Sequence, residues 1–342
     1  MYKTNIWRIT IDTNPEDCNL NCIMCEEHSK YSEFIPKLYK KTGIKRRIMP
    51  FEYLEKIFIQ AKELNVKEII PSTMGEPLLY KYFDEIIRLC YKYQIQLNLT
   101  TNGTFPKKTV RDWANQILPI VSDIKISWNG ATKEVAESIM EGINFEKVLL
   151  NVKELISIRE EVFLQTNHYA QISFQVTFMQ NNMHELSDII KLASELGVDR
   201  VKGHHLWDHF DEIKNLSFKK NIESRKIWNQ YVKEAYLTQN QYLKKEGTEV
   251  KLENIHLFPD EDEFSLPSNS ICPFLNKEIW ISATGKISPC CAPDELRDSL
   301  GDFGNIQKNT IQEVVKSTVY QNLVHQYTEH SLCKNCNMRK VI

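Results

Sequence analysis

Three cysteines lie close together near the start of the chain, at Cys18, Cys22 and Cys25. They form a Cys-x3-Cys-x2-Cys array within the stretch from Asp17 to Ser29. Three thiolates on one short loop can hold three irons of a [4Fe-4S] cube and leave the fourth iron open to a cofactor or substrate. The array therefore predicts a site for chemistry.

Zinc is the alternative interpretation of this array. Structural zinc takes four ligands, commonly from two paired knuckles. The nearest candidate for a fourth ligand is His28, whose side chain would have to fold straight back onto the loop. The spacing therefore favours an iron-sulfur cluster and leaves zinc as the competing possibility.

The array follows the first of six short strands that alternate with amphipathic helix patterns. These strands are expected at residues 6–12, 68–73, 97–99, 124–128, 172–178 and 199–203. Such alternation is typical of a parallel sheet covered by helices, and each strand here ends in a small polar cluster. The sequence predicts an α/β fold with an incomplete (βα)6 TIM-type barrel, whose active site lies at the carboxyl ends of the strands.

Beyond residue 205 the alternation stops. A helix is expected from Ile222 to Tyr242, followed by an acidic, loop-like stretch up to residue 270. A hairpin turning at Gly285 and a helix between Ile311 and Val324 come next, and five cysteines flank them: Cys272, Cys290, Cys291, Cys333 and Cys336. We expect a barrel at 1–210, a helical and acidic connection at 211–267, and a small C-terminal α+β domain with a metal cage at 268–342.

The array, its place after a first strand and the later Met74-Gly75-Glu76-Pro77 resemble the radical S-adenosylmethionine (SAM) superfamily. The resemblance implies an enzyme with a (βα)6 core, whose open iron chelates the amino and carboxylate groups of SAM. One electron, from a donor such as flavodoxin or ferredoxin, then cleaves SAM to methionine and a 5'-deoxyadenosyl radical. That radical takes a hydrogen atom from the substrate.

The same resemblance implies particular SAM contacts. The carboxylate of Glu76, next to Gly75, pairs with the ammonium of SAM, although the family usually has a second glycine before Gly75. Asn102 and Ser127, at the ends of strands three and four, match ribose and carboxylate contacts, and either could instead stabilise a turn. Met24 stands where the family usually places an aromatic residue beside the adenine.

The C-terminal cysteines resemble the twitch domain, a shortened SPASM domain. The pattern runs Cys272-x12-Gly285-x4-Cys290 and then Cys333-x2-Cys336. It implies a second [4Fe-4S] cluster on these four cysteines, with a four-cysteine zinc site as the alternative. Cys291 is surplus, and because adjacent side chains point apart on an extended backbone, Cys290 is the expected ligand.

Histidines gather where the sixth strand is expected to end. His204, His205 and Asp208 are candidate catalytic residues there, because histidine moves protons near neutral pH. The alternative is a loop anchored by hydrogen-bonded histidines. Cys90, in contrast, falls on the apolar face of a predicted helix and is expected to be a core thiol.

Charge and composition restrict the possible partners. With 43 basic and 45 acidic residues, the formal net charge of −2 disfavours binding to nucleic acid or to a membrane surface. The start lacks a signal-peptide pattern, so we expect a cytoplasmic protein whose nine cysteines serve metal or redox chemistry rather than disulfides. A zinc-stabilised RNA-binding module is the competing class, and it would need a basic face.

The substrate is the least constrained expectation. A second cluster is a plausible acceptor of an electron from a substrate radical, which favours an oxidative or bond-forming modification. The resemblance implies a ribosomally made peptide or a small alcohol as substrate, and the long connection at 205–270 exceeds what a small alcohol should need, so a peptide is favoured. The first strand begins almost at Met1 and leaves no room for an N-terminal peptide-recognition domain, so we expect a separate recognition protein or a grip by residues 205–270. The alternative is dehydrogenation of a small molecule such as an aminocyclitol or sugar alcohol.

Overall fold

The computed structural model describes residues 5–71, 74–259, 270–292, 294–334, 336 and 338–341. They fall into two compact units, the first from the described parts of 1–17, 38–98 and 265–342, the second from 18–37 and those of 99–264. Ser72, Thr73, residues 260–269 and Asn335, which belong to predicted elements, lie outside the described residues. Within the described ranges, no helix is both long and apolar enough to span a membrane.

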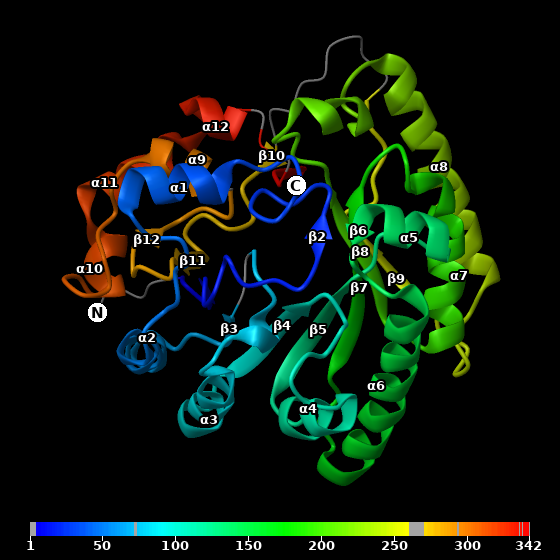
Figure 1. The fold of residues 1–342 in the computed structure, drawn as a ribbon, viewed down its shortest axis with the longest axis horizontal. Coiled ribbons are helices and arrows are strands. Elements are labelled where there is room, and N and C mark those ends of the chain that lie inside the picture. Colours follow the sequence, from blue (N-terminus) through cyan, green and yellow to red (C-terminus); the bar gives the residue numbers. More distant parts are fainter. Residues whose placement is uncertain are drawn as a thin grey trace. The chain divides into compact units, whose positions relative to one another are not determined.

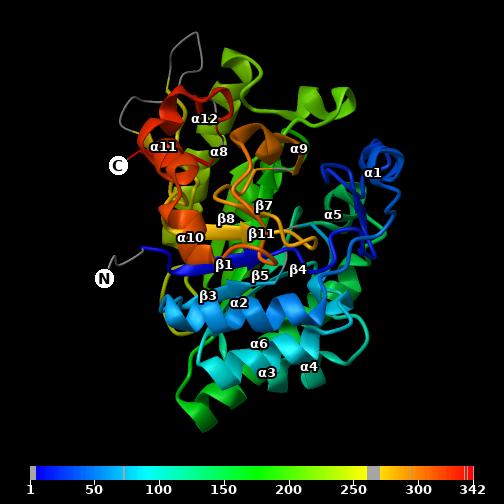
Figure 2. The same ribbon diagram turned by 90° about the vertical axis from the view of Figure 1, so that its left-hand side faces the viewer.

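The first unit is built on strands in the order β12-β11-β1-β3-β4. The predicted strands β1 (Arg8–Ile11), β3 (Glu68–Ile70) and β4 (Gln96–Thr101) are parallel, and β4 carries the chain into the second unit after Asn98. Strand β11 (Glu278–Ile281) is parallel to β1 on its other edge, and β12 (Ile287–Ser288) returns antiparallel to it. Figure 2 shows β11 beside β1. The predicted C-terminal hairpin therefore extends this sheet.

Two amphipathic helices of the first unit follow β1 and β3. They are α2 (Phe51–Glu63), preceded by the N-cap residue Pro50, and α3 (Phe83–Tyr93). Their buried positions reproduce the predicted apolar stripes: Leu54, Ile57, Phe58 and Ala61 on α2, and Phe83, Ile86, Ile87 and Cys90 on α3. Cys90 is 1% exposed, which confirms its place in the core.

The second unit contains four parallel strands in the order β5-β7-β8-β9. They are β5 (Val121–Ser127), β7 (Gln171–Phe178), β8 (Arg200–His205) and β9 (Lys251–Glu253). The helices between them are α4 (Val110–Ile117), α5 (Lys133–Ile139), α6 (Phe145–Thr166), α7 (Leu186–Leu196) and α8 (Ile222–Gln241), and Figure 1 shows α6 and α7 alongside this sheet. The six predicted strands are thus present in the predicted chain order, which confirms the α/β fold of (βα)6 type.

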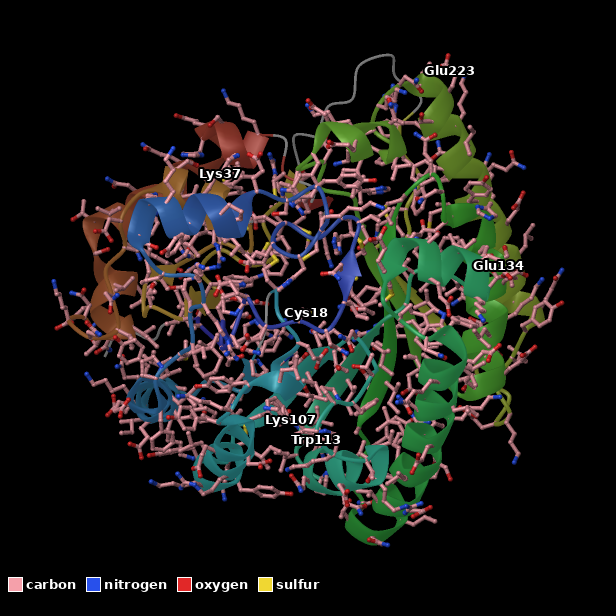
Figure 3. All side chains as sticks on the ribbon, viewed as in Figure 1. Cys18, Lys37, Lys107, Trp113, Glu134 and Glu223 are labelled. Atoms are coloured by element: carbon pink, nitrogen blue, oxygen red, sulfur yellow. The ribbon has the colours of Figure 1, made fainter. Side chains whose placement is uncertain are left out.

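Local sequence signals explain where these helices begin and end. The side chains of Thr109 and Asn144 cap α4 and α6 by accepting hydrogen bonds from backbone N–H groups of the first turn. Gly197 ends α7 in the left-handed conformation, with φ of 83°. Charged residues such as Glu134 on α5 and Glu223 on α8 project from the surface (Figure 3).

The stretch at 246–270, expected to be a loop, instead contributes β9. This strand has only three residues, and its Lys-Leu-Glu sequence carries no apolar run. It is a strand because it pairs in parallel with β8, Leu252 lying opposite Val201. A tertiary partner therefore determines its structure more than its own propensity does.

The C-terminal region adds short elements to the first unit. They are β10 (Ser270–Ile271), which pairs antiparallel with β13 (Lys340–Val341), and α9 (Asp294–Arg297), α10 (Ile311–Lys316), α11 (Thr318–Gln326) and α12 (Ser331–Lys334). The single helix predicted across 311–324 is wrong. Helix α10 ends at Lys316, and the hydroxyl of Ser317 then accepts a hydrogen bond from the Tyr320 N–H at 3.3 Å, which starts α11.

Candidate functional site

The three N-terminal cysteines lie on a loop of the second unit that short strands hold in place. Strand β2 (Asn21–Cys22) pairs antiparallel with β6 (Met140–Glu141), and the Ile23 N–H donates to the carbonyl of Ile139 at 2.9 Å. Figure 3 marks Cys18, where the loop begins. Burial raises the pKa of Cys25 to about 12, and the pKa of Cys22 is raised by burial and by the neighbouring thiols of Cys25 and Cys18.

These thiols have the environment that an iron-sulfur cluster requires. They are close enough to act on one another's pKa, so a cation is needed to keep several of them as thiolates. The backbone N–H of His28 donates to the Cys25 sulfur at 3.4 Å, a contact that supports a metal-bound sulfur. Among the described residues, no three His, Cys, Asp or Glu side chains converge tightly enough for a single metal ion. Three cysteines on one short loop are the donor set of a [4Fe-4S] cluster with one open iron.

Asn102, predicted as a SAM contact, follows β4 and contacts the cysteine loop. Its amide nitrogen donates to Asn19 Oδ1 at 2.9 Å and toward the Cys18 sulfur at 3.9 Å. Its amide oxygen accepts from the backbone N–H and the hydroxyl of Thr104, at 3.0 and 2.7 Å. The triad Asn19, Asn102 and Thr104 thus ties the residues after β4 to Cys18. Sequence reasoning missed Asn19 and Thr104, because only the fold brings them together.

In the first unit, the turn at Gly75 and Glu76 packs against the residues that lead into the cysteine loop. The Glu76 N–H donates to the Asp17 carbonyl at 2.7 Å, and the Asn14 amide donates to the Glu76 carbonyl at 3.0 Å. A side chain at Gly75 would come within 2.2 Å of the Asn14 carbonyl oxygen, so only glycine fits there. Met74, which precedes this glycine, is half-buried.

The Glu76 side chain is buried and hydrogen-bonded to the backbone that follows it. It is 1% exposed, and its Oε1 accepts the backbone N–H of Leu78 at 3.2 Å at the start of the 3-10 turn Pro77–Leu79. Glu76 is therefore a buried, oriented carboxylate in a turn that is hydrogen-bonded to the backbone of Asp17. Such a group suits recognition of an ammonium.

One face of the sheet in the second unit is polar. The strand register places these side chains together on it: Asp123, Lys125 and Ser127 of β5, Ser173, Gln175 and Thr177 of β7, and Arg200, Lys202 and His204 of β8. Arg200 pairs with Asp123 and, at 2.8 Å, with Glu253 of β9, which satisfies the charges at the amino ends of these strands. Nearer the carboxyl ends, Gln175 contacts the ring of His204 at 3.4 Å. Ser127, Gln175 and His204 are thus neighbours, as a binding surface needs.

The three predicted catalytic residues do not lie together: two are on opposite faces of strand β8 (Arg200–His205) and the third lies beyond it. His204 and His205 lie within β8, not in a loop after it, so they point to opposite faces. Burial lowers the pKa of His204 to about 4, so its imidazole is neutral at neutral pH. The ring of His205 packs on the apolar face, 4.5 to 5.4 Å from the ring centres of Phe258, Trp228 and Phe178. Asp208 is exposed beyond the strand.

Five cysteines line one cavity in the first unit: Cys272, Cys290, Cys291, Cys333 and Cys336. The cavity itself has a volume of about 30 Å³. Backbone N–H groups donate to three of the sulfurs, at 3.3 Å for Cys272 and 3.4 Å for Cys290 and Cys336. Four cysteines at the predicted positions around one cavity fit a second cluster, and such N–H contacts are typical of its sulfur ligands.

The expectation that Cys290 and Cys291 point apart is wrong. Both line the cavity, and the Cys291 thiol is hydrogen-bonded to the Cys290 sulfur, which lowers the pKa of Cys290 to about 7. Two further contacts lie at this position: the Cys290 N–H donates to the Ser288 hydroxyl and the Ala292 N–H donates to the Cys290 sulfur, both at 3.4 Å.

Two parts of the chain match known families. Residues 15–170 match the family model of the radical SAM superfamily, and residues 272–337 match that of SPASM, an iron-sulfur cluster-binding domain. These ranges include the cysteine loop and the five-cysteine cavity respectively.

Two known proteins are similar to this chain in sequence. The chain is 23% identical to the "Tungsten-containing aldehyde ferredoxin oxidoreductase cofactor-modifying protein" of Pyrococcus furiosus, over 94% of this chain and 85% of that protein. It is 30% identical to the GTP 3',8-cyclase of Campylobacter jejuni, over 52% of this chain and 57% of the cyclase.

Solved structures show the same fold. Streptococcus suis SuiB bound to S-adenosylmethionine matches with a TM-score of 0.67 and 17% identity, over 98% of this chain and 71% of SuiB. Native anSMEcpe with bound AdoMet and Cp18Cys peptide matches with a TM-score of 0.64 and 20% identity, over 96% of this chain and 85% of that protein.

Proposed function

We propose that this chain, which belongs to the radical SAM superfamily and carries a C-terminal SPASM-type region, catalyses the oxidative modification of a peptide. Membership makes it an enzyme whose cofactors are SAM and [4Fe-4S] clusters. We assign the first cluster to Cys18, Cys22 and Cys25, and the second to Cys272, Cys290, Cys333 and Cys336. The five-cysteine cavity is the observation that carries the oxidative assignment, because it offers a second place for an electron.

When bound, SAM and the first cluster would supply one-electron cleavage chemistry, and a second cluster would offer a place for an electron that an oxidative modification removes. The chain's own residues hold and orient these groups. Asn102 orients Cys18 through the triad with Asn19 and Thr104. Glu76 offers a buried carboxylate to the ammonium of SAM.

The remaining predicted contacts keep their assignments as proposals. We place Ser127 toward the SAM carboxylate and Met24 beside the adenine. Among the histidines we favour His204 as a substrate contact, because it shares the polar face with Ser127 and Gln175 and its neutral ring can accept or donate a hydrogen bond. His205 packs in an aromatic cluster and Asp208 is exposed, so we assign neither a proton transfer.

We also retain the functional division into a barrel at 1–210, a connection at 211–267 and a cluster domain at 268–342. The connection includes α8, whose side chains bind the backbone of the segment after β9. Trp228 donates to the carbonyl of His256 at 2.8 Å, and Asn229 to that of Phe258 at 3.0 Å. Because these hydrogen bonds fix the connection, it presents a constant surface to an extended peptide.

A peptide substrate is supported by the proteins of similar fold. One SuiB structure contains its precursor peptide SuiA, and one anSMEcpe structure contains the Cp18Cys peptide. The names of the sequence relatives instead point to a nucleotide and to a cofactor-modifying protein, so a small-molecule oxidation is the second candidate.

Co-expression with precursor peptides encoded beside the gene tests this proposal. We expect a mass loss of about two hydrogens, or a bond between residues, on one such peptide, measured by mass spectrometry of the purified peptide. The matched control is the Cys18→Ala variant with the same peptide, which should return the unmodified mass. Unchanged peptides together with turnover of an aminocyclitol, sugar alcohol or nucleotide would overturn the peptide assignment.

The electron donor is proposed to be an acidic protein such as flavodoxin. The segment from Tyr39 to Arg47 carries five cations and no acid, and most of it is exposed. Arg46 and Arg47 pair with Asp17 and Glu16, directly ahead of Cys18, at 2.5 Å in each pair. The two arginines of this basic segment therefore lie beside the residues that enter the cluster loop.

Reversing the charge of this segment tests docking of the electron donor separately from cleavage of SAM. In the Lys40→Glu/Lys41→Glu variant, SAM cleavage driven by reduced flavodoxin should fall about tenfold and lose its salt dependence, because electrostatic steering sets the encounter rate. Cleavage driven by dithionite should not change. The control is Lys147→Glu/Lys153→Glu on the exposed face of α6. An equal loss in both double variants would contradict docking at the basic segment.

A further inference from the structure

We propose that Arg339 is a positioning residue that joins two of the segments around the five-cysteine cavity and so retains the second cluster there. This inference rests on the proposed function, since it takes Cys272, Cys290, Cys333 and Cys336 as the ligands. The spacing of these cysteines gives Arg339 no role, and the structure places it on the lining of the cavity.

The four assigned ligands come from three separate parts of the chain. Cys272 follows β10, Cys290 follows β12, and Cys333 and Cys336 lie on α12 and just after it. A cluster needs all four thiolates at once, so the site keeps its metal only while these segments stay together. Contacts that join the segments therefore control how firmly the cluster is held.

Arg339 joins the Cys272 segment to the Cys333 segment. Its Nη2 and Nε both donate to the carbonyl of Ser270, at 2.6 and 3.2 Å, and its Nη1 donates to the carbonyl of Cys333 at 3.3 Å. These three hydrogen bonds form the Arg339 bridge, and the pairing of β13 with β10 follows directly after it in the chain. The planar fork of a guanidinium can hold two carbonyls in a fixed relation, which a single ammonium cannot do.

The guanidinium also brings a positive charge to the lining of the cavity. Among the residues that the structure describes, no carboxylate pairs with Arg339, which contacts the two carbonyls and lies over the ring of Tyr327, with 5.8 Å between the guanidinium carbon and the ring centre. The Tyr327 hydroxyl in turn accepts the Cys272 N–H at 3.4 Å. A cation placed there favours an anionic occupant, and a cube with four thiolate ligands is anionic.

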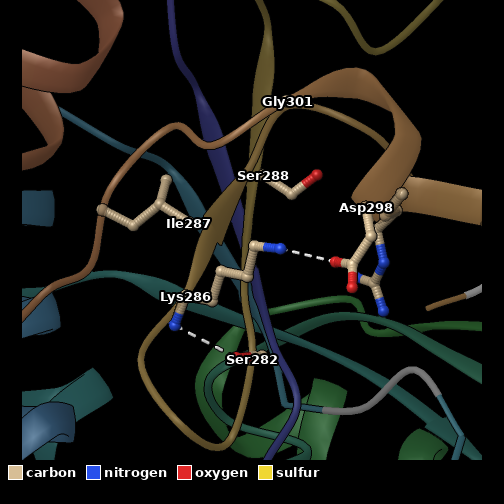
Figure 4. Close-up of a pocket in the computed structure, with 7 residues that line it drawn as sticks. Ser282, Lys286, Ile287, Ser288, Asp298 and Gly301 are labelled. Atoms are coloured by element: carbon tan, nitrogen blue, oxygen red, sulfur yellow. Dashed lines mark hydrogen bonds and ion pairs between the residues drawn. The ribbon is translucent and has the colours of Figure 1, made fainter. Parts of the chain in front are cut away.

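The Cys290 segment is anchored by other contacts. Figure 4 shows the hairpin ahead of it, where the Lys286 N–H donates to the Ser282 hydroxyl at 3.1 Å and the Lys286 ammonium pairs with Asp298 at 2.5 Å. The two paired side chains are 41% and 55% exposed, so this ion pair contributes little to stability. Lys286→Gln therefore removes a cation from the same unit without touching the Arg339 bridge, and it is the matched control.

Iron release from the second cluster tests this inference. In the full chain with the three loop cysteines changed to alanine, anaerobic reconstitution should leave about four irons, all at the second site. Arg339→Gln in this background should release iron to a chelator about tenfold faster, because loss of a contact that orients metal ligands typically weakens metal binding by about that factor. Arg339→Lys keeps the charge but not the fork, so its rate should be intermediate, and Lys286→Gln should match the parent chain.

A spectroscopic signature separates positioning from general destabilisation. Loss of the contact to the Cys333 carbonyl should loosen that ligand, so mild oxidation of the Arg339→Gln chain should yield a three-iron cluster, detected by electron paramagnetic resonance, while the parent keeps its cube. Circular dichroism of the two chains should be the same. If Arg339→Gln does not fold, Arg339→Lys decides alone: faster release than in the parent supports the bridge, and an equal rate rejects it.

The other outcomes distinguish this inference from the proposed function. Parental release rates in both Arg339 variants, with iron present, would reject the Arg339 bridge and leave the second cluster in place. Equal acceleration in Lys286→Gln would also reject it, because a surface ion pair would then matter as much as the bridge. Zinc in place of iron in the triple-alanine chain would instead reject the second cluster itself, and with it the proposed oxidation.

Discussion

Changing Cys18, Cys22 or Cys25 to alanine is expected to abolish formation of 5'-deoxyadenosine from SAM. The array supplies three thiolates and no fourth, so each one is needed to hold the cube with one iron open. The loop gives no substitute for a lost thiolate, because β2 and β6 fix its backbone. The measurement is chromatography of the nucleoside after anaerobic reduction with dithionite, which removes any dependence on a protein donor.

Cys90→Ala is the matched control for these variants. It removes a buried thiol from the core of α3 and should cost about 1 kcal/mol of stability without affecting the reaction. SAM cleavage at the normal rate is therefore expected. Continued nucleoside formation in any of the three loop variants would contradict the assignment of the loop to the first cluster.

The strands and helices with strong local patterns could be predicted from the sequence. The apolar stripe of α2 and the alternation in β7 each place apolar side chains on one face, and residue spacing alone predicts such a face. The predictions that failed concern elements whose structure depends on pairing with residues far away in the chain. Strand β9 exists because β8 pairs with it, and β11 lies in parallel beside β1, a pairing that no local pattern indicates.

Predictions about the candidate site succeeded or failed for the same reasons. Cysteine spacing located both thiol groups, because ligands of one cluster must lie close together. The position of Asn102 on Cys18 required the fold, since Asn19 and Thr104 become neighbours only there. The separation of His204 from His205 was available in principle, because adjacent residues of a strand face opposite ways. The strand was predicted to end too early for that argument to be applied.

Changing Cys333 to alanine is expected to remove the second metal site while SAM cleavage continues. Cys333 lies on α12, and burial raises its pKa to about 12, so it is a thiolate only while metal is bound. Its loss should take about four irons from the reconstituted chain. Nucleoside formation under dithionite should persist, because the first cluster lies on the separate loop of Cys18, Cys22 and Cys25. Modification of the substrate should stop.

The metal content of the unaltered chain after anaerobic reconstitution tests the two-cluster account most directly. Iron and zinc are counted per chain by elemental analysis of protein freed of unbound metal, alongside the visible absorption of the sample. The account predicts about eight irons, no zinc and the broad absorption of iron-sulfur clusters. About four irons with one zinc would contradict the second cluster, and colourless protein with zinc alone would contradict the enzyme assignment altogether.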